Sequence, residues 1–205
     1  MQLQQKHIDA LDKAEHLMLR VNYCPYLDLK DLLAQNTTHA RQQFRKLFAS
    51  YYSLNAGGLT DEFKDKYFQI LHGGRVFKSG QPRYKTIIIR LNKFKRRKGD
   101  YALPLSFVSK LVAVHDETCP IYDRYVLEFF AERVPGADKP RNVRIDWFLK
   151  FIAQIKSDYQ SWAKVKAVQA ILTRLKTRDP QLAKCDAVRL IDFLVWNAGN
   201  HQLLK

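Results

Sequence analysis

Apolar residues recur three and four positions apart along most of this chain, which is the spacing of an amphipathic α-helix. In residues 4–20, for example, Ile8, Leu11 and Met18 share one helical face. Segments with the same spacing follow, separated by turns rich in Gly, Pro and Asn. They predict helices over residues 27–34, 38–54, 61–71, 83–98, 104–115, 121–133, 142–177 and 187–196. The segment 142–177 is expected as one helix or as two that meet near Asp158.

Residues 83–98 are the ambiguous segment, because Ile87, Ile88 and Ile89 are β-branched and such residues favour strands. A helix is preferred, since Ile87, Leu91 and Phe94 follow helical spacing and no other segment offers a partner strand. The sequence therefore predicts an all-α fold. The alternative is an α+β fold with one small hairpin around residues 75–91.

The length of 205 residues suits a single domain, within which two lobes are possible. The stretch 72–82 is rich in glycine and is the expected loop between them. The predicted lobes are an N-terminal helical lobe, residues 1–72, and a basic helical lobe, residues 81–205.

Several features indicate a cytoplasmic protein without a cofactor. No apolar run approaches the roughly 18 residues that a membrane span needs, and the first residues lack the basic and apolar regions of a signal peptide. The three cysteines, Cys24, Cys119 and Cys185, are far apart, so neither disulfides nor a cysteine zinc site is expected, and a reducing compartment is the default. The histidines lie at no metal-ligand spacing and no glycine-rich phosphate loop is present, so we expect neither a metal nor a cofactor.

The balance of charge points to a polyanionic partner. Lys and Arg outnumber Asp and Glu by 35 to 20, a net charge of +15. Residues 73–100 carry +9 and residues 139–178 carry +8, whereas residues 1–72 are nearly balanced. Solubility alone does not require such a polarised distribution, but binding to nucleic acid does. We expect nucleic acid, DNA rather than RNA, and no membrane, since a membrane surface calls for a basic amphipathic helix with an aromatic and leucine face.

The densest basic run is residues 93–98, which is either a phosphate-binding surface or a solvated helix end. Its length and the net charge around it favour binding. The candidate nucleic-acid ligands are Arg90, Lys93, Lys95, Arg96, Arg97, Lys98, Lys110 and Arg124.

Residues 83–130 contain the most informative motif. A basic segment leads through a connection at 99–105 to an apolar helix at 106–115, and then to Pro120-Ile121-Tyr122-Asp123-Arg124-Tyr125-Val126. Taken alone, Asp123 before a helix is an ordinary N-cap, which contributes about 1 kcal/mol.

The same order resembles the helix–hairpin–helix DNA glycosylase superfamily, in which a Pro-Val-Asp-x-x-Val element bears the essential aspartate. The resemblance implies two helical lobes, with Asp123 as the catalytic carboxylate that stabilises an oxocarbenium-like sugar after the base has left the stack. It also implies that Tyr101, Tyr122 and Tyr125 line a base pocket, although aromatic residues at such positions more often belong to the core.

The motif departs from the family at two places. The connection has one displaced glycine, Gly99, where the family has Leu-Pro-Gly-x-Gly, and Ser106 and Phe107 stand where bifunctional members have a lysine. The function that the sequence predicts is therefore monofunctional base excision, in DNA repair or in defence against foreign DNA. The alternatives are a non-catalytic nucleic-acid-binding protein of the same fold and a helical module that binds an acidic protein. Base excision predicts an open pocket at Asp123, and the non-catalytic protein predicts a filled pocket. The module that binds an acidic protein predicts an exposed apolar patch.

Overall fold

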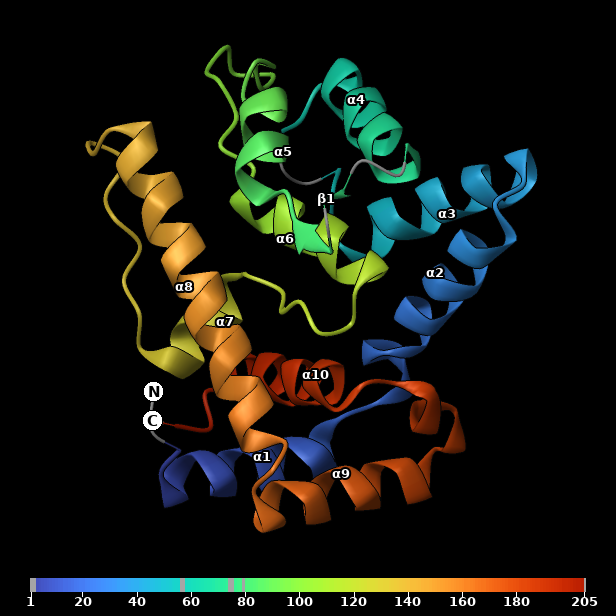
Figure 1. Cartoon of the computed structure of the whole chain (residues 1–205), viewed down its shortest axis with the longest axis vertical. Coiled ribbons are helices and arrows are strands. Elements are labelled where there is room, and N and C mark those ends of the chain that lie inside the picture. Colours follow the sequence, from blue (N-terminus) through green and yellow to red (C-terminus); the bar gives the residue numbers. More distant parts are fainter. Residues whose placement is uncertain (1–2, 56–57, 74–75, 79, 205) are drawn as a thin grey trace. The chain divides into compact units, whose positions relative to one another are not determined.

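A computed structural model describes residues 3–55, 58–73, 76–78 and 80–204 of the chain. Within these residues it contains ten α-helices, two 3-10 turns and one antiparallel pair of two-residue strands (Figure 1). The predicted helical fold is confirmed. In the part that the structure describes, no helix is both long and apolar enough to cross a membrane.

The helices form two compact units. Unit 1 consists of Met1–Asn22 together with Asp116–Lys205, and unit 2 of Tyr23–His115. This grouping differs from the lobes 1–72 and 81–205 that the glycine-rich loop suggests. The reason is that the first helix buries its apolar face against the C-terminal helices, so its side chains belong to their core.

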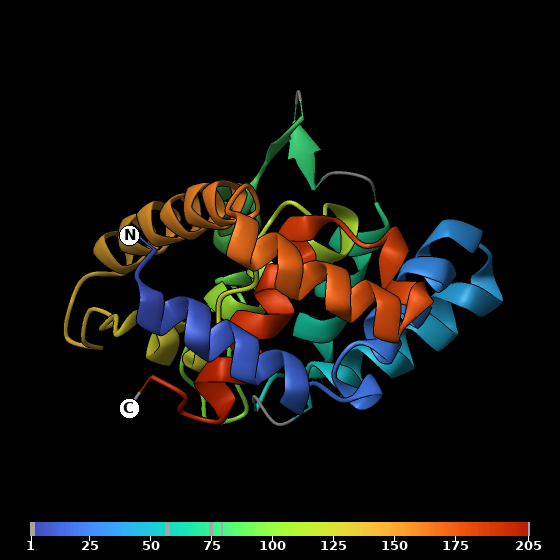
Figure 2. The same ribbon diagram turned by 90° about the horizontal axis from the view of Figure 1, so that it is seen from below.

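Unit 1 is built around its last helix. Helix α10 (Ala187–Asn200) contacts α1 (Gln5–Leu17), α7 (Arg124–Phe130), α8 (Arg141–Trp162) and α9 (Lys166–Arg178), and α1 and α9 lie side by side (Figures 1 and 2). Nearly every residue of α10 is buried and most of them are apolar, so this helix is central, whereas the others carry polar outer faces. Gly199 allows α10 to approach α7, because a Cβ there would overlap the Tyr125 carbonyl oxygen.

Unit 2 packs five helices around aromatic side chains. They are α2 (Cys24–Gln35), α3 (Thr38–Tyr51), α4 (Asp61–His72), α5 (Tyr84–Leu91) and α6 (Leu105–His115). Phe44, Phe48, Phe63 and Tyr67 are fully buried among them. The Tyr67 hydroxyl donates to the Phe107 carbonyl at 2.7 Å, which fixes α6 against α4.

The first residues of several helices are set by local features of the sequence. Thr37 and Thr60 are N-caps, and their hydroxyls accept from Ala40 N at 3.1 Å and Phe63 N at 3.3 Å. Pro25 lies in the first turn of α2, where its missing N–H costs nothing, so the helix begins earlier than the predicted residue 27.

Several predicted helices have other limits in the structure. The helix at 83–98 ends at Leu91, and the helix at 121–133 is only Arg124–Phe130. The long segment is two helices, but they meet at residues 163–165, and Asp158 lies buried inside α8. The small hairpin that was the alternative prediction exists as β1 (Phe77–Lys78) paired with β2 (Gln81–Pro82), seen as a narrow ribbon in Figure 2, while the isoleucine run is helical.

Candidate nucleic-acid interface

The excess positive charge lies mostly in unit 2. Its sequence contains seventeen basic and six acidic residues, a net charge of +11, whereas unit 1 carries +4. The basic region 139–178 belongs to unit 1, where acidic residues elsewhere in the unit offset much of its charge. Seven of the eight candidate ligands are in unit 2, and only Arg124 is in unit 1.

The densest basic run forms a hairpin-like loop, residues 92–101, which we call the basic loop. Ala102 N donates to the Phe94 carbonyl at 3.2 Å, and Arg96 N donates to the Asp100 carbonyl at 2.6 Å. The side chains of Arg96 and Asp100 form an ion pair across the same turn. Gly99 adopts a φ of 87°, which a residue with a Cβ rarely takes, and so closes the turn.

Pairing with a distant segment explains why this run is not helical. Leu59 forms a β-bridge with Arg96, and Arg97 N donates to the Gly58 carbonyl at 2.8 Å. A continued helix would have lost these bonds and would have placed like charges one turn apart, which is unfavourable. The loop therefore gives the cations backbone partners that hold them on the surface.

The basic loop exposes its cationic side chains. Lys93, Lys95, Arg96, Arg97 and Lys98 are all exposed. Arg96 pairs with Asp100, and Lys95 lies 5.6 Å from the ring centroid of Tyr101, which is 46% exposed. Lys93, Arg97 and Lys98 form no ion pair with any described residue, so their charges face solvent uncompensated.

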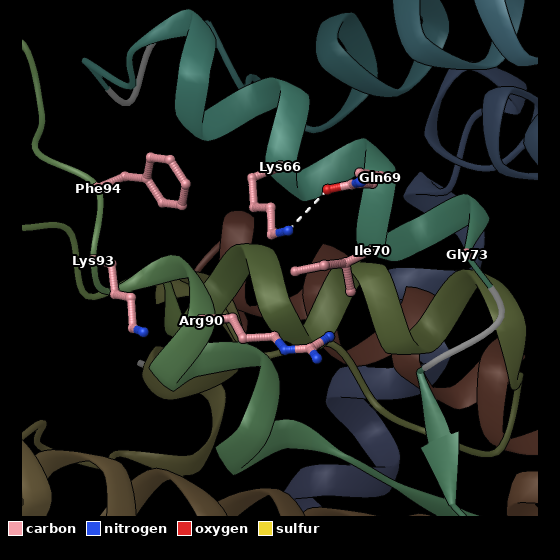
Figure 3. A pocket seen from close by; sticks show the side chains of 7 residues that line it. All are labelled: Lys66, Gln69, Ile70, Gly73, Arg90, Lys93 and Phe94. Carbon is pink, nitrogen blue, oxygen red and sulfur yellow. Dashed lines mark hydrogen bonds between the residues drawn. The ribbon is translucent and has the colours of Figure 1, made fainter.

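A cavity of about 550 Å³ lies between α4, α5 and the start of the basic loop. Figure 3 shows side chains from α4 and from α5 pointing into it from opposite sides. Lys66 Nζ donates to Gln69 Oε1 at 2.8 Å at its edge. The cavity is lined by three cations, two apolar side chains, an amide and a glycine: Lys66, Arg90, Lys93, Ile70, Phe94, Gln69 and Gly73.

A second cavity of about 490 Å³ shares Gln69 and Gly73 with the first. It adds the cations Arg41 and Arg45, and Arg45 forms an ion pair with Asp65 at its edge. Burial, assisted by the charges of Arg41 and His115, lowers the pKa of His72 to about 4. His72 therefore adds no charge to this cavity at neutral pH.

Lys110, on α6, faces aromatic rings. Its ammonium lies 5.4 Å from the ring centroid of Tyr52 and 5.6 Å from that of Phe107. It does not line either of these cavities.

Asp123, in unit 1, is the N-cap of α7. Its Oδ1 accepts from Tyr125 N at 3.0 Å and from Val126 N at 3.3 Å, and its Oδ2 accepts from Trp196 Nε1 at 2.9 Å. The residue is half-buried and lines neither of the two cavities. Both oxygens of the carboxylate thus carry bonds that stabilise the protein itself.

The segment before Asp123 is held by a buried ion pair on α10. Arg189 pairs with Asp192, and neither side chain is more than 3% exposed. Arg189 donates to the Cys119 carbonyl at 2.8 Å, and the Asp192 carboxylate accepts from Ile121 N at 3.2 Å. This network fixes the turn that leads into α7 and therefore the position of Asp123.

The three candidate pocket tyrosines have different surroundings. Tyr122 is 7% exposed and packs edge-on against an aromatic cluster, and burial raises its pKa to about 12. Tyr125 packs against Trp196, and the Arg124 guanidinium lies 4.4 Å from the Tyr125 ring centroid. Tyr101 lies on the basic loop in unit 2. Tyr122 and Tyr125 therefore lie near Asp123 in unit 1, and Tyr125 N donates to its carboxylate, whereas Tyr101 belongs to unit 2.

The cavity residues on α4 were missed by the sequence analysis. Lys66, Gln69, Ile70 and Gly73 are spaced three, four and seven apart, so they share one stripe of the helix. That spacing was the available signal for these residues. The stripe mixes charged, polar and apolar residues, however, so it does not match the pattern of a helix face that packs in the core.

No family model, curated protein or solved structure matches this chain. Among the described residues there is also no group of three or more His, Cys, Asp or Glu side chains that could hold a metal ion. The function is therefore inferred from the charges and cavities alone.

Proposed function

We propose that this protein binds nucleic acid through unit 2, with the basic loop and the adjoining cavity as the binding surface. The observation that carries the proposal is the position of Lys93, which begins the basic loop and also lines the cavity. It belongs both to the loop that carries the exposed cations Arg97 and Lys98 and to the cavity that Lys66 and Arg90 line.

The physical basis is counterion release. Each phosphate that Lys or Arg neutralises frees condensed counterions and adds about 0.9 to the salt dependence of duplex binding. Uncompensated cations such as Lys93, Arg97 and Lys98 bind phosphates without first breaking an internal ion pair, which favours these three over Arg96.

The surroundings of Asp123 favour the non-catalytic alternative over base excision. A glycosylase needs a carboxylate aimed at a cavity that holds an extruded base. Asp123 instead caps α7 and accepts from Trp196, and Tyr122 is packed in the core. We therefore assign Asp123 a structural role.

A protein partner is less well supported than nucleic acid. Such a partner calls for a contiguous apolar patch of a few hundred Å² beside the charge. Among the described residues of unit 2, the large apolar side chains that are exposed are Ile89 and Tyr101. Two separate side chains are ordinary for a protein surface.

The test is a salt titration of DNA binding, followed by the fluorescence anisotropy of a short labelled duplex. We expect a steep loss of affinity with salt for the wild type. Arg97→Ala combined with Lys98→Ala should lower the slope of log K against log salt by about 2, one contact for each residue. Binding that does not depend on salt, or no binding at all, would overturn the proposal.

The matched control is Lys164→Ala combined with Lys166→Ala. Both residues are exposed and lie in the basic region of unit 1, so the net charge changes by the same amount. We expect little change in the slope. An equal loss in the two double variants would mean that overall charge, and not the surface of unit 2, governs binding.

A further inference from the structure

The cavity between α4 and α5 has features that phosphate binding alone does not require. Building on the proposed function, we propose that it receives the base of an unpaired nucleotide, so that unit 2 binds single-stranded nucleic acid in preference to a duplex.

Phe94 is placed to stack on a base. The side chain is half-buried, and its ring packs perpendicular to that of Phe63, with 6.3 Å between the ring centroids. The ring is thus anchored to the core of unit 2 while it lines the cavity. Ile70, from α4, supplies a second apolar side chain (Figure 3). Every base has a π-face, so such a site accepts bases without regard to sequence.

The charges around Phe94 suit the phosphates of the same nucleotide. Lys66, Arg90 and Lys93 line the cavity, and none of the described residues that line it is acidic. Figure 3 shows Lys66 reaching in from α4 and Arg90 from α5. Gln69 accepts from Lys66 through its oxygen, and its amide nitrogen is a donor for the edge of a base. A cavity lined by both apolar side chains and cations matches a nucleotide better than a free phosphate ion.

The size of the cavity fits one nucleotide. Its volume of about 550 Å³ lies within the range of roughly 300 to 1,000 Å³ that is usual for small-molecule sites. A base inside a duplex is stacked on both faces and paired at its edge, and it enters a cavity only after it leaves the stack. An unpaired base avoids that cost, which is why we expect a preference for single strands.

The second cavity gives the strand a path. It meets the first at Gln69 and Gly73, at the C-terminal end of α4, and it contains Arg41 and Arg45. A strand whose base occupies the first cavity would place neighbouring phosphates near Arg41, since Arg45 already pairs with Asp65 of the same cavity. A positively charged groove with an aromatic platform is the usual arrangement of single-strand binders.

The test compares three labelled DNA ligands at one salt concentration: a single strand, its duplex, and a strand of the same length made entirely of abasic sites. The abasic strand keeps the phosphates and removes the bases. Phe94→Leu keeps apolar volume in the core and removes the ring. The matched control, Tyr101→Leu, removes an exposed aromatic ring from the same loop that does not line the cavity.

We expect the wild type to bind the single strand about 5- to 150-fold more tightly than the abasic strand, which is the contribution of one stacked base. Phe94→Leu should lose most of this difference, whereas its binding of the abasic strand and the duplex should not change. Tyr101→Leu should behave as the wild type. The abasic strand and the duplex serve as internal references, because a variant that fails to fold loses binding of all three ligands. Phe94→Tyr keeps an aromatic ring and should retain the preference for the single strand over the abasic strand.

Other outcomes separate this inference from the proposed function. Salt-sensitive binding of all three ligands with equal affinity, unchanged by Phe94→Leu, would overturn the unpaired-base site and leave nucleic-acid binding in place. Binding of none of them would overturn both. If a free nucleoside monophosphate binds as tightly as the strand and Phe94→Leu weakens it, the cavity is a mononucleotide site and the strand assignment is wrong.

Discussion

Replacing Asp123 with alanine tests the structural role that the hydrogen bonds assign to it. The change removes the N-cap of α7, a loss of about 1 kcal/mol. It also removes the acceptor of Trp196 Nε1, and a hydrogen bond to a charged group contributes about 1.5 to 3 kcal/mol when fully buried. Trp196 is only half-buried, so water replaces part of that bond and the smaller value applies. We expect Asp123→Ala to lower the free energy of unfolding of unit 1 by about 2.5 kcal/mol.

Tryptophan fluorescence during urea unfolding is the assay, because Trp147, Trp162 and Trp196 all lie in unit 1 and report on that unit alone. Asp123→Ser keeps a capping oxygen and loses the tryptophan bond, so it should lie between the wild type and Asp123→Ala. Trp196→Phe removes the same bond from the other side. The double variant Asp123→Ala with Trp196→Phe should then cost less than the two single changes together, by about 1 kcal/mol.

An unfolding free energy of Asp123→Ala within about 0.5 kcal/mol of the wild type would refute the structural assignment, because that is the scatter of ordinary surface changes. Catalytic activity that depends on Asp123 would also refute the structural assignment. If the wild type releases free base from a duplex with damaged or modified bases and Asp123→Asn does not, Asp123 is catalytic and the glycosylase resemblance extends to function.

Two further predictions concern packing and pH. Gly199→Ala should destabilise unit 1 by about 1 to 3 kcal/mol, because the new methyl meets the Tyr125 backbone; Gly136→Ala, where only the mobile Asp138 carboxylate is in the way, should cost less in the same urea titration. The lowered pKa of His72, about 4, means that the folded state binds fewer protons than the unfolded state between about pH 6.5 and pH 4. The stability of unit 2 should fall as pH falls through this window, and His72→Gln should reduce the fall, measured by hydrogen exchange of peptides from Tyr23–His115; an unchanged slope would contradict the assignment.

The helices and their starts could be predicted from the sequence because local signals specify them. Thr37 and Thr60 precede helical patterns, and threonine is a common N-cap; their hydroxyls accept the capping bonds from Ala40 N and Phe63 N. The division into units could not be predicted, since it depends on long-range packing. Asn197 on α10, for example, donates to the Ala14 carbonyl at 2.8 Å, and the sequence around either residue does not predict that contact.

The candidate site was predicted in part. Periodicity and charge identified the six cations of residues 90–98, all of which are in unit 2, but they did not identify the cavity residues on α4. The candidate Asp123 came from a local motif, and its bond to Trp196 joins residues 73 positions apart. A motif of seven residues specifies which side chain opens a helix but not whether a cavity faces it, so the chemistry of Asp123 depended on contacts outside the motif.

Helix α5 ends at Leu91, although the sequence pattern predicts a helix to residue 98, and this early end creates the proposed binding site. On a helix running to residue 98, Phe94 would have joined Ile87 and Leu91 on a buried stripe, and the cations would have been spread around the helix axis at 100° intervals. Because the chain leaves the helix and pairs with residues 58–59, Phe94 is only half-buried and lines the cavity with Lys93. Positions where local preference yields to tertiary contacts are often functional. Here that position places an aromatic ring beside uncompensated cations, which is the combination that an unpaired nucleotide requires.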